Sequence, residues 1–559
     1  MTDKVWLKNY PDGVPATINP AEYSSLAQMI GESIEQFAEL PAYHCMGRTI
    51  TYSDLDRLSR HFAAWLQSGA RLVKGDRVAI MLPNCLQYPI ALLGILRSGL
   101  TAVNVNPLYT PRELQHQLQD SGAKALVILE NFAHVFESVR TATAVEQVVT
   151  TGVGDLLTFP KSAAVNFVLR CVRRQVPAYD LPGATSFRQV LRSGKFLPYA
   201  TPQLTLDDIA FLQYTGGTTG IAKGAVLTHR NMVANVLQAS AWLGAKIRPG
   251  ESTAITALPL YHIFSLTANC LTFMRRGGFN VLITNPRDFP DFVATLRKFR
   301  FTYLSGVNTL FNALLHSAGF EQLDFSALNM SLGGGMAVQR AVAEHWKKVT
   351  KNVLTQAWGL TETSPAVCIN PFEIQDFNGS VGLPVSSTEV VACDDSGKEL
   401  GINQVGEICV RGPQVMRGYW NRPDETAKVM LPGGWLRTGD IGYVDAQGFV
   451  FLQDRKKDMI LVSGFNVYPN EVEDVVVKHP GVLEAAAVAQ ADERSGEVVA
   501  LFVVRKDPAL TAEQIIEHCR AELTGYKIPK HVYFRNELPK TNVGKILRRA
   551  LRDELVKTA

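Results

Sequence analysis

The sequence lacks the features that mark secreted, membrane-spanning and zinc-stabilised proteins. Its 8 cysteines are scattered without a Cys-x-x-Cys pair, so neither a disulfide framework nor a zinc site is predicted. Residues 1–8 contain no apolar core and are not expected to form a signal peptide. The longest weakly charged run, residues 258–274, includes a proline, a histidine and an asparagine and falls short of a membrane span. We therefore expect a globular protein of the reducing cytoplasm.

An excess of charge of one sign is also absent. The 559 residues carry 56 Lys and Arg against 52 Asp and Glu, a net charge of +4 that is small for this length. Nothing in this balance favours a nucleic-acid partner. The hydrophobic content of 46% and the charged content of 19% are typical of a globular protein, and the length predicts several domains or subdomains.

What the sequence does contain is a regular alternation of predicted helices and strands. Apolar runs at residues 77–82 and 125–129 are typical of buried strands. Thr110, Pro111 and Glu113 form a helix start with an N-cap, a first-turn proline and a capping glutamate. Alternation of this kind predicts an α/β fold with parallel layers.

The pattern of predicted helices and strands changes twice in the second half of the chain. At residues 380–453, short predicted strands alternate with glycine turns, which indicates a small β-barrel-like subdomain. The charged run DRKKD at residues 454–458 then precedes a smaller unit of mixed helices and strands. We therefore predict a large domain of residues 1–454 and a small α+β domain of residues 455–559.

Glycine and threonine are densest in the stretch YTGGTTGIAKG at residues 214–224. It follows the apolar run 209–212, a predicted strand, and precedes a helix predicted to open at Thr228. Glycine permits close approach of the backbone to a phosphate, N–H and hydroxyl groups donate to it, and Lys223 adds a charge. The Walker A pattern is absent, because Lys223 lies three residues beyond Gly220 and no Ser or Thr follows it. A phosphate-binding loop is predicted, with a plain turn as the alternative.

A short stretch at residues 167–174, FVLRCVRR, is basic and partly apolar. Such a stretch can rest on an anionic membrane surface. The simpler interpretation is the solvated face of a helix, and the sequence leaves both open.

Five motifs in a fixed order resemble those of the acyl-adenylate-forming (AMP-binding) enzymes, which include acyl-CoA synthetases, luciferases and peptide-synthetase adenylation domains. The motifs are the loop at 214–224, WGLTE at 358–362, RTGD at 437–440, DRKKD at 454–458 and PKTNVGKI at 539–546. Further stretches resemble bacterial long-chain-fatty-acid–CoA ligases, at residues 104–111, 257–264, 434–442 and 460–469. The resemblance implies a large N-terminal domain and a small mobile C-terminal lid, with a hinge at 455–458 and the site between them.

The resemblance also implies a set of ATP-binding residues. These are Thr215, Gly216, Gly217, Thr218, Thr219, Gly220, Lys223, Gly334, Gly335, Trp358, Thr361, Asp440, Arg455 and Lys545. Asp440 is expected to accept hydrogen bonds from both ribose hydroxyls, with Arg455 beside it. Thr215 and Glu362 are the implied ligands of Mg²⁺, which prefers oxygen donors. Trp358 and Ala357 depart from the tyrosine and glycine usual in the family, and their effect on the acyl pocket stays open.

Three residues are implied to be catalytic: Lys545, Glu362 and His262. Lys545 is expected to reach the carboxylate and the α-phosphate during adenylation only, where its charge stabilises the transition state. His262 is expected beside the acyl carboxylate, with a structural histidine as the alternative. Lys457 is the implied hinge residue, at which the lid turns between half-reactions.

Coenzyme A is expected to meet the lid at Ser463 and Gly464, a pair that is also typical of a plain turn. Little chain follows Lys545, so a free acceptor is expected rather than a fused carrier domain. We predict ATP-dependent activation of a long-chain fatty acid to its acyl-CoA thioester through an acyl-adenylate, with release of AMP and pyrophosphate.

Two other functions remain as alternatives: a ligase for a medium-chain or aryl acid, and a non-catalytic nucleotide-binding protein. The expected partners are a fatty acid, ATP and CoA, with Mg²⁺ as cofactor and no nucleic acid. The sequence leaves open the preferred chain length, a homodimer, and a peripheral contact of a cytoplasmic enzyme with the inner face of the membrane.

Overall fold

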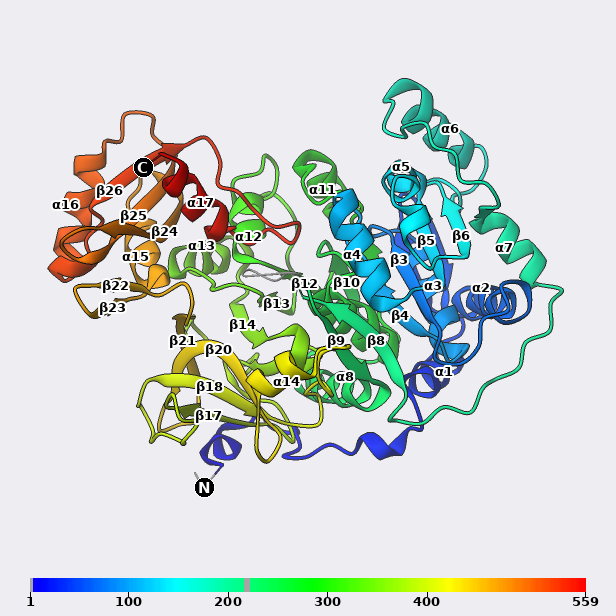
Figure 1. Ribbon diagram of the computed structural model, residues 1–559, viewed down its shortest axis with the longest axis horizontal. Helices are drawn as coiled ribbons and strands as arrows, with labels where there is room; N and C mark the ends of the chain where they lie inside the picture. The colour runs from blue at the N-terminus through cyan, green and yellow to red at the C-terminus, as the bar shows by residue number, and fades with distance from the viewer. Residues whose placement is uncertain (1–3, 216–221, 559) are drawn as a thin grey trace.

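The computed structural model describes residues 4–215 and 222–558, which form a mixed α/β fold with a large N-terminal domain and a C-terminal domain (Figure 1). The described residues contain two large sheets in the N-terminal body, a five-stranded sheet beside them, and a five-stranded sheet in the C-terminal part. The predicted fold class is confirmed. The exact division at residue 454 stays a prediction.

One large sheet has seven strands in the order β7-β6-β5-β3-β4-β8-β9. Its pairings are parallel except that β9 runs antiparallel to β8. The strands are β3 (Arg77–Met81), β4 (Thr101–Asn104), β5 (Ala125–Leu129), β6 (Gln147–Thr151), β7 (Thr185–Ser186), β8 (Ile209–Tyr214) and β9 (Gly224–Thr228).

The other large sheet has nine strands in the order β16-β15-β14-β13-β12-β10-β11-β1-β2. It is parallel from β14 to β1, and antiparallel strands close both edges. The strands are β1 (Pro41–Cys45), β2 (Arg48–Thr51), β10 (Thr253–Thr256), β11 (Phe279–Leu282), β12 (Tyr303–Gly306), β13 (Met330–Gly333), β14 (Leu354–Gly359), β15 (Ala366–Ile369) and β16 (Leu383–Pro384).

The two smaller sheets are mostly antiparallel. The first lies at the lower left of Figure 1 and contains β17 (Glu389–Cys393), β18 (Gly406–Arg411), β19 (Met430–Leu431), β20 (Trp435–Val444) and β21 (Val450–Arg455). The second belongs to the C-terminal part and contains β22 (Ile460–Val462), β23 (Phe465–Val467), β24 (Val482–Asp492), β25 (Gly496–Arg505) and β26 (His531–Arg535).

Helices cover these sheets. The α-helices are α1 (Leu26–Gln36), α2 (Tyr52–Ala64), α3 (Gln87–Arg97), α4 (Pro111–Ser121), α5 (Ala133–Glu137), α6 (Lys161–Phe167), α7 (Phe187–Gly194), α8 (His229–Leu243), α9 (Ile263–Ser265), α10 (Thr272–Arg275), α11 (Phe289–Leu296), α12 (Asn308–Leu315), α13 (Arg340–Thr350), α14 (Pro423–Val429), α15 (Pro469–Val476), α16 (Ala512–Glu522) and α17 (Arg548–Thr558).

The predicted start of α4 is confirmed in detail. The Thr110 hydroxyl accepts a hydrogen bond from the N–H of Glu113, and the Glu113 carboxylate accepts one from the N–H of Thr110. Gly122 ends the helix with φ of 58°, a left-handed conformation that glycine adopts without a steric penalty.

The predicted helix start at Thr228 is confirmed, but the stretch between the Gly/Thr loop and this helix was not predicted to be a strand. A strand, β9, lies between them and pairs antiparallel with β8, so that Tyr214 faces Gly224. Helix α8 begins directly after Thr228, whose side chain caps it. The short apolar run at 225–227 is buried in the sheet and forms the strand that the helical pattern obscured.

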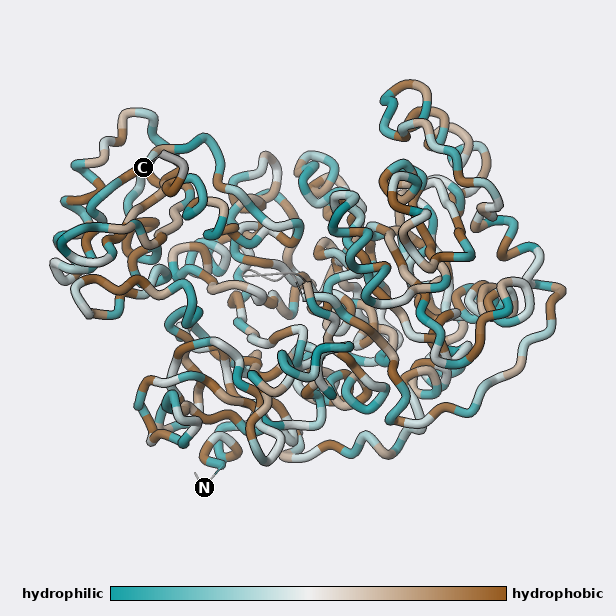
Figure 2. The backbone as a smooth tube through the Cα atoms, viewed as in Figure 1, coloured by the Kyte–Doolittle hydropathy of each residue, from teal (hydrophilic) through white to brown (hydrophobic). Residues whose placement is uncertain are grey.

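The core lies within the strands of the large sheets and the helices packed on them. Figure 2 shows the apolar segments concentrated in these interior strands. Helix α3 is buried at every position except Arg97, and its Tyr88 hydroxyl contacts both Asn104 and the carbonyl of Leu260, at 2.8 Å each. Within residues 4–215 and 222–558, no helix is long and apolar enough to cross a membrane.

Candidate active site

A cavity of about 1650 Å³ extends from the N-terminal body to the C-terminal part of the chain. The expected site residues that line it are Thr215, Lys223, His262, Gly334, Gly335, Trp358, Thr361, Glu362, Asp440, Arg455, Lys457 and Lys545. The predicted loop residues Gly216, Gly217, Thr218, Thr219 and Gly220 lie outside the described residues. Motifs that lie more than 300 residues apart in the sequence thus meet around one space.

Lys545 enters the cavity on a turn that docks against α12. The carbonyl of Gly544 accepts a hydrogen bond from the Thr309 hydroxyl at 2.9 Å. Gly544 has φ of 85°, and a Cβ there would lie 2.9 Å from the same hydroxyl, so the close approach requires glycine. Beyond this contact, the Lys545 side chain passes Gly335, where a Cβ would come within 3.3 Å of its Cε. Thr309 was not expected from the sequence, because nothing local links α12 to this turn.

The electrostatic surroundings of Lys545 mix charges of both signs. Burial, followed by the nearby Arg455 guanidinium, lowers the pKa of Lys545 to about 8, while the carboxylates of Asp440 and Glu362 act in the opposite direction. A half-buried cation of this kind is placed to meet an anionic group that enters the cavity.

Asp440 is held by two partners that the cavity walls supply. Arg455, opposite it on the neighbouring strand, contacts one carboxylate oxygen at 2.7 Å. The indole N–H of Trp358 donates to the other oxygen at 2.9 Å. Burial raises the pKa of Asp440, and both Arg455 and the Trp358 hydrogen bond counteract that rise. Each carboxylate oxygen keeps a second lone pair, so Asp440 remains able to accept hydrogen bonds from a ligand diol.

Thr215 and Lys223 lie at the two ends of the Gly/Thr loop. The N–H of Thr215 donates to the carbonyl of Lys223 at 3.0 Å, which closes the hairpin. The Lys223 ammonium pairs with Glu425 of α14 and lies 4.8 Å from the centre of the Tyr419 ring. A phosphate bound here would compete with Glu425 for Lys223.

Glu362 stands on the short helix η9 (Thr361–Thr363), next to the cavity. Its carboxylate accepts a hydrogen bond from the Tyr419 hydroxyl at 2.7 Å. Tyr419 was missed from the sequence, where the run RGYW at 417–420 is the only signal. The oxygens of Glu362 and Thr215 are hard donors in one cavity, and two such donors suit Mg²⁺, which keeps waters and ligand phosphate oxygens in its shell. In the part of the chain that the structure describes, no group of three or more His, Cys, Asp and Glu side chains could hold a metal by itself.

His262 borders the cavity and precedes α9. Its Nδ1 accepts a hydrogen bond from the N–H of Phe264 at 3.3 Å. Burial and the nearby charge of Lys545 lower the pKa of His262 to about 3, so the ring is neutral at physiological pH. A neutral imidazole can orient a carboxylate by hydrogen bonding without repelling Lys545.

Gly334 leaves room beside the cavity wall. A Cβ at this position would lie 3.0 Å from the carbonyl oxygen of Ala357 and 3.1 Å from the Phe264 ring. Larger apolar side chains line a further part of the same cavity: Leu243, Phe264, Tyr303, Leu332, Phe372 and Phe377. The cavity therefore offers a charged region around Lys545 and Asp440 and an apolar region for a hydrophobic group.

Ser463 and Gly464 are not brought into the site. They form the exposed turn between β22 and β23, with φ of 51° and 85°, and do not border the cavity. Lys457 does border it, within the short connection between β21 and β22.

Ionic contacts span this connection. The Arg548 side chain, on α17, binds Glu473 of α15 at 2.9 Å and lies 3.6 Å from Asp454 of β21. The N–H of Asn470 donates to Asp454 at 2.9 Å. These contacts hold the C-terminal part in the arrangement that puts Lys545 in the cavity.

Comparison with known proteins gives matches along nearly the whole chain. A family model described as AMP-binding enzyme matches residues 30–420, and one described as AMP-binding enzyme C-terminal domain matches residues 471–545. The long-chain-fatty-acid–CoA ligase of Escherichia coli O157:H7 is 58% identical over 551 residues, which cover 99% of this chain and 98% of that protein. The ligase of the same description from Bacillus subtilis (strain 168) is 36% identical over 559 residues, covering 99% and 98%.

A solved structure is similar in fold as well. The anthranilate CoA ligase AuaEII in complex with anthranoyl-AMP superposes with a TM-score of 0.85 at 25% identity. The match covers 97% of this chain and 99% of that chain.

Proposed function

The chain belongs to the AMP-binding enzyme family, and from this membership we propose that it activates a long-chain fatty acid as its CoA thioester. In the first half-reaction, the fatty carboxylate attacks the α-phosphate of ATP, which forms acyl-AMP and releases pyrophosphate. In the second, the thiol of CoA attacks the acyl carbon and AMP leaves. The observation that carries this proposal is that one cavity joins a half-buried lysine, a carboxylate–arginine pair and an apolar region.

Lys545 is the residue proposed to stabilise the first transition state. Negative charge grows on the α-phosphoryl oxygens as the carboxylate attacks, and a buried ammonium interacts with it more strongly than a solvated one would. Its low-dielectric surroundings and its position beside Asp440 support this role. His262, neutral and next to Lys545, is proposed to orient the attacking carboxylate.

Asp440, Arg455 and Trp358 are proposed to hold the nucleoside. Asp440 would accept hydrogen bonds from the ribose hydroxyls, and its two existing partners fix the direction of its oxygens. The Trp358 ring, beside Gly334 and Gly335, would form one wall for adenine. The Gly/Thr loop and Lys223 would contact the outer phosphates.

Thr215 and Glu362 are the proposed ligands of Mg²⁺, with Thr361 next to them on η9. When bound, the ion would neutralise charge on the phosphate oxygens. Tyr419 holds the Glu362 carboxylate in position by its hydrogen bond.

The C-terminal part is proposed to rotate about residues 455–458 between the half-reactions. Two features support this. Lys545 occupies the cavity, as adenylation requires, while Ser463 and Gly464 are exposed on a turn outside it. A rotation that withdraws Lys545 would be able to bring that turn to the cavity and offer it to CoA.

The pH dependence of adenylation follows from Lys545. Its protonated form carries the charge, and its pKa is about 8, so the charge is present below that pH and lost above it. We expect kcat/KM for ATP, measured as pyrophosphate release, to fall about tenfold per pH unit on the alkaline side. In Lys545→Arg the guanidinium stays protonated, so the remaining activity should lack this alkaline limb. A flat profile in the unaltered enzyme, or the same limb in Lys545→Arg, would contradict the assignment.

The function itself is tested with purified protein, ATP, Mg²⁺, CoA and palmitate. We expect equal amounts of AMP and palmitoyl-CoA. The kcat/KM values for hexanoate, benzoate and 4-coumarate, measured in parallel, should be lower. A higher kcat/KM for one of these acids would assign the enzyme to that substrate class instead. If no AMP forms with any acid, the ligase proposal is refuted.

The enzyme is further proposed to act in the cytoplasm, in peripheral contact with the inner face of the membrane. The eight cysteines are all free thiols, which suits a reducing compartment. Long-chain fatty acids partition into bilayers, so contact with a bilayer shortens the path of the substrate to the cavity.

A further inference from the structure

Helix α6 and the π-helical turn η6 (Val168–Val172) that continues it project from the body at the upper right of Figure 1. Large apolar side chains on this projection point into solvent. The exposed fractions are 84% for Phe159, 61% for Phe167, 38% for Val168 and 64% for Val172. Such side chains are normally covered when they gather on one element.

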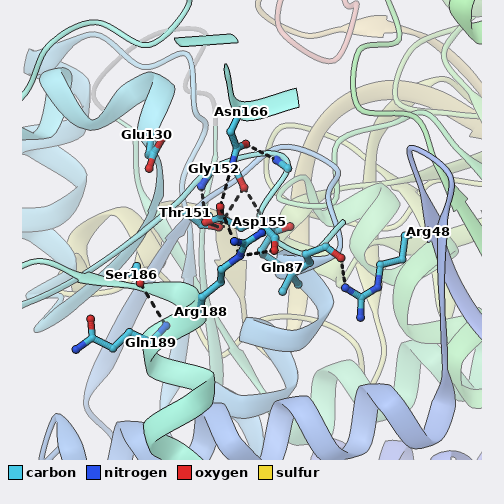
Figure 3. Close-up of polar contacts among 12 residues, drawn as sticks. Arg48, Gln87, Glu130, Thr151, Gly152, Asp155, Asn166, Ser186, Arg188 and Gln189 are labelled. Carbon is cyan, nitrogen blue, oxygen red and sulfur yellow. Dashed lines mark hydrogen bonds and ion pairs between the residues drawn. The ribbon is translucent and has the colours of Figure 1, made fainter. Parts of the chain in front are cut away.

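The inner side of the same helix is held by polar contacts (Figure 3). The Asn166 amide accepts from the N–H of Gly154 at 2.8 Å and donates to Asp155 at 2.9 Å. Arg170 forms a two-pronged pair with Glu130 of the body. Asn166 and Arg170 thus fix the helix to the body beside the half-buried Val165 and Leu169, while the large side chains of Phe167, Val168 and Val172 stay exposed.

The outward residues recur at intervals of four. Ala164, Val168 and Val172 follow one another in this way, and Phe167 and Cys171 lie beside them. Residues spaced in this way share one side of a helix, and all five are exposed. The apolar side chains therefore form a continuous ridge rather than scattered positions.

Basic side chains flank the ridge. Residues 158–179 contain Lys161, Arg170, Arg173 and Arg174 and no Asp or Glu. All four are exposed, and Arg170 is paired with Glu130. The tip of the β1–β2 hairpin lies beside this surface, because a Cβ on Gly47 would be 2.8 Å from the Lys161 ammonium. Met46, next to Gly47 at this tip, is exposed as well.

We propose that this surface, the α6–η6 patch (Phe159, Lys161, Phe167, Val168, Val172, Arg173 and Arg174), docks the enzyme on the anionic phospholipid surface of a bilayer. The apolar ridge enters the headgroup region and the basic residues contact lipid phosphates. This inference specifies which surface of the enzyme makes the membrane contact proposed above, and it rests on that proposal. Two identical basic patches would repel each other, so charge favours an anionic surface over a second copy of this chain.

Vesicle flotation tests the patch without ATP, fatty acid or CoA, so that a failed ligase assay cannot be mistaken for failed docking. We expect binding to vesicles of equal parts phosphatidylglycerol and phosphatidylcholine, and little to phosphatidylcholine alone. Arg173→Gln/Arg174→Gln should weaken binding about 25-fold, since each basic residue near the surface contributes about a factor of five. Phe167→Ser/Val172→Ser should weaken it at least about tenfold, because the ridge loses most of its apolar area.

A matched control is available on the other side of the molecule. Ile402 and Val405 are exposed apolar residues, 39% and 43%, in the turn between β17 and β18. Ile402→Ser/Val405→Ser removes a pair of exposed apolar side chains outside the ridge and should leave vesicle binding unchanged. Each variant should keep the melting temperature of the unaltered protein, because none of these side chains is buried.

Cys171 gives an independent readout. It is the exposed cysteine among the eight, the other seven being buried, so an environment-sensitive thiol dye will label the patch itself. The dye should shift to shorter emission wavelengths on addition of the anionic vesicles and return at high salt.

Three results would overturn the proposal. They are equal binding by the Phe167→Ser/Val172→Ser variant, equal binding to neutral vesicles, and a concentration-dependent dimer that this variant abolishes while vesicles bind neither form. The last result would make the patch an interface between copies of the chain.

Discussion

Lys545→Ala is expected to slow acyl-AMP formation by about 100- to 1,000-fold, the loss typical of removing one donor that stabilises transition-state charge. The half-buried side chain lies where the charges of Arg455, Asp440 and Glu362 act on it together. Thioester formation from supplied acyl-AMP should keep most of its rate. The two effects diverge because this cation acts on the α-phosphate only while pyrophosphate leaves.

The two half-reactions are separated by measurement. Pyrophosphate release with ATP and palmitate reports adenylation, and palmitoyl-CoA formed from palmitoyl-AMP and CoA reports the thioester step. Lys540→Ala is the matched control, because Lys540 lies on the same segment but pairs with Glu484 of the C-terminal part at 2.6 Å. It should change both rates by less than about threefold, because this partly exposed ion pair lies within the C-terminal part. Equal losses in both half-reactions for Lys545→Ala would exclude a role confined to adenylation.

Lys457→Pro is expected to slow the thioester half-reaction at least about tenfold more than adenylation, because proline restricts φ at its own position and the backbone of the residue before it. The arrangement with Lys545 in the cavity already exists, so adenylation does not require a further turn of the connection. The thioester step does require the connection to turn, because the turn at Ser463 and Gly464 must move to reach CoA.

The Lys457→Ala variant distinguishes an effect of the backbone from the loss of the side chain. It removes the ammonium but leaves φ and ψ free, so it should retain the thioester step far better than the proline variant. The same pair of half-reaction assays gives the comparison. A uniform loss in Lys457→Pro, or an alanine variant as impaired as the proline one, would argue against a hinge at this residue.

Local chemistry explains which parts of the fold were predictable. Thr110, Pro111 and Glu113 predicted the start of α4, because their interactions lie within one helical turn. The strands at residues 77–82 and 125–129 appear as β3 and β5, because apolar β-branched runs indicate buried strands directly. The strand β9 was missed, since its apolar run at 225–227 is short and lies between the Gly/Thr loop and the helix start at Thr228.

The residues of the site likewise fall into those that were predicted and those that were missed. Resemblance pointed to the lysine, the carboxylates and the arginine, and the structure places them around one cavity. It did not point to Tyr419, which holds Glu362, or to Thr309, which receives the Gly544 turn. Both make contacts over a long separation in sequence, for which periodicity and spacing contain no signal.

The sequence alone determined the chemical groups of this protein: an α/β chain, a Gly/Thr loop, and motifs that supply a lysine, carboxylates and an arginine in a set order. Only the tertiary structure decided which of these groups meet, that Trp358 binds Asp440, and that Phe167, Val168 and Val172 are exposed. The reason is physical. Local patterns report the preferences of neighbouring residues, whereas burial, pKa shifts and the exposure of apolar side chains arise from packing between segments that lie far apart along the chain.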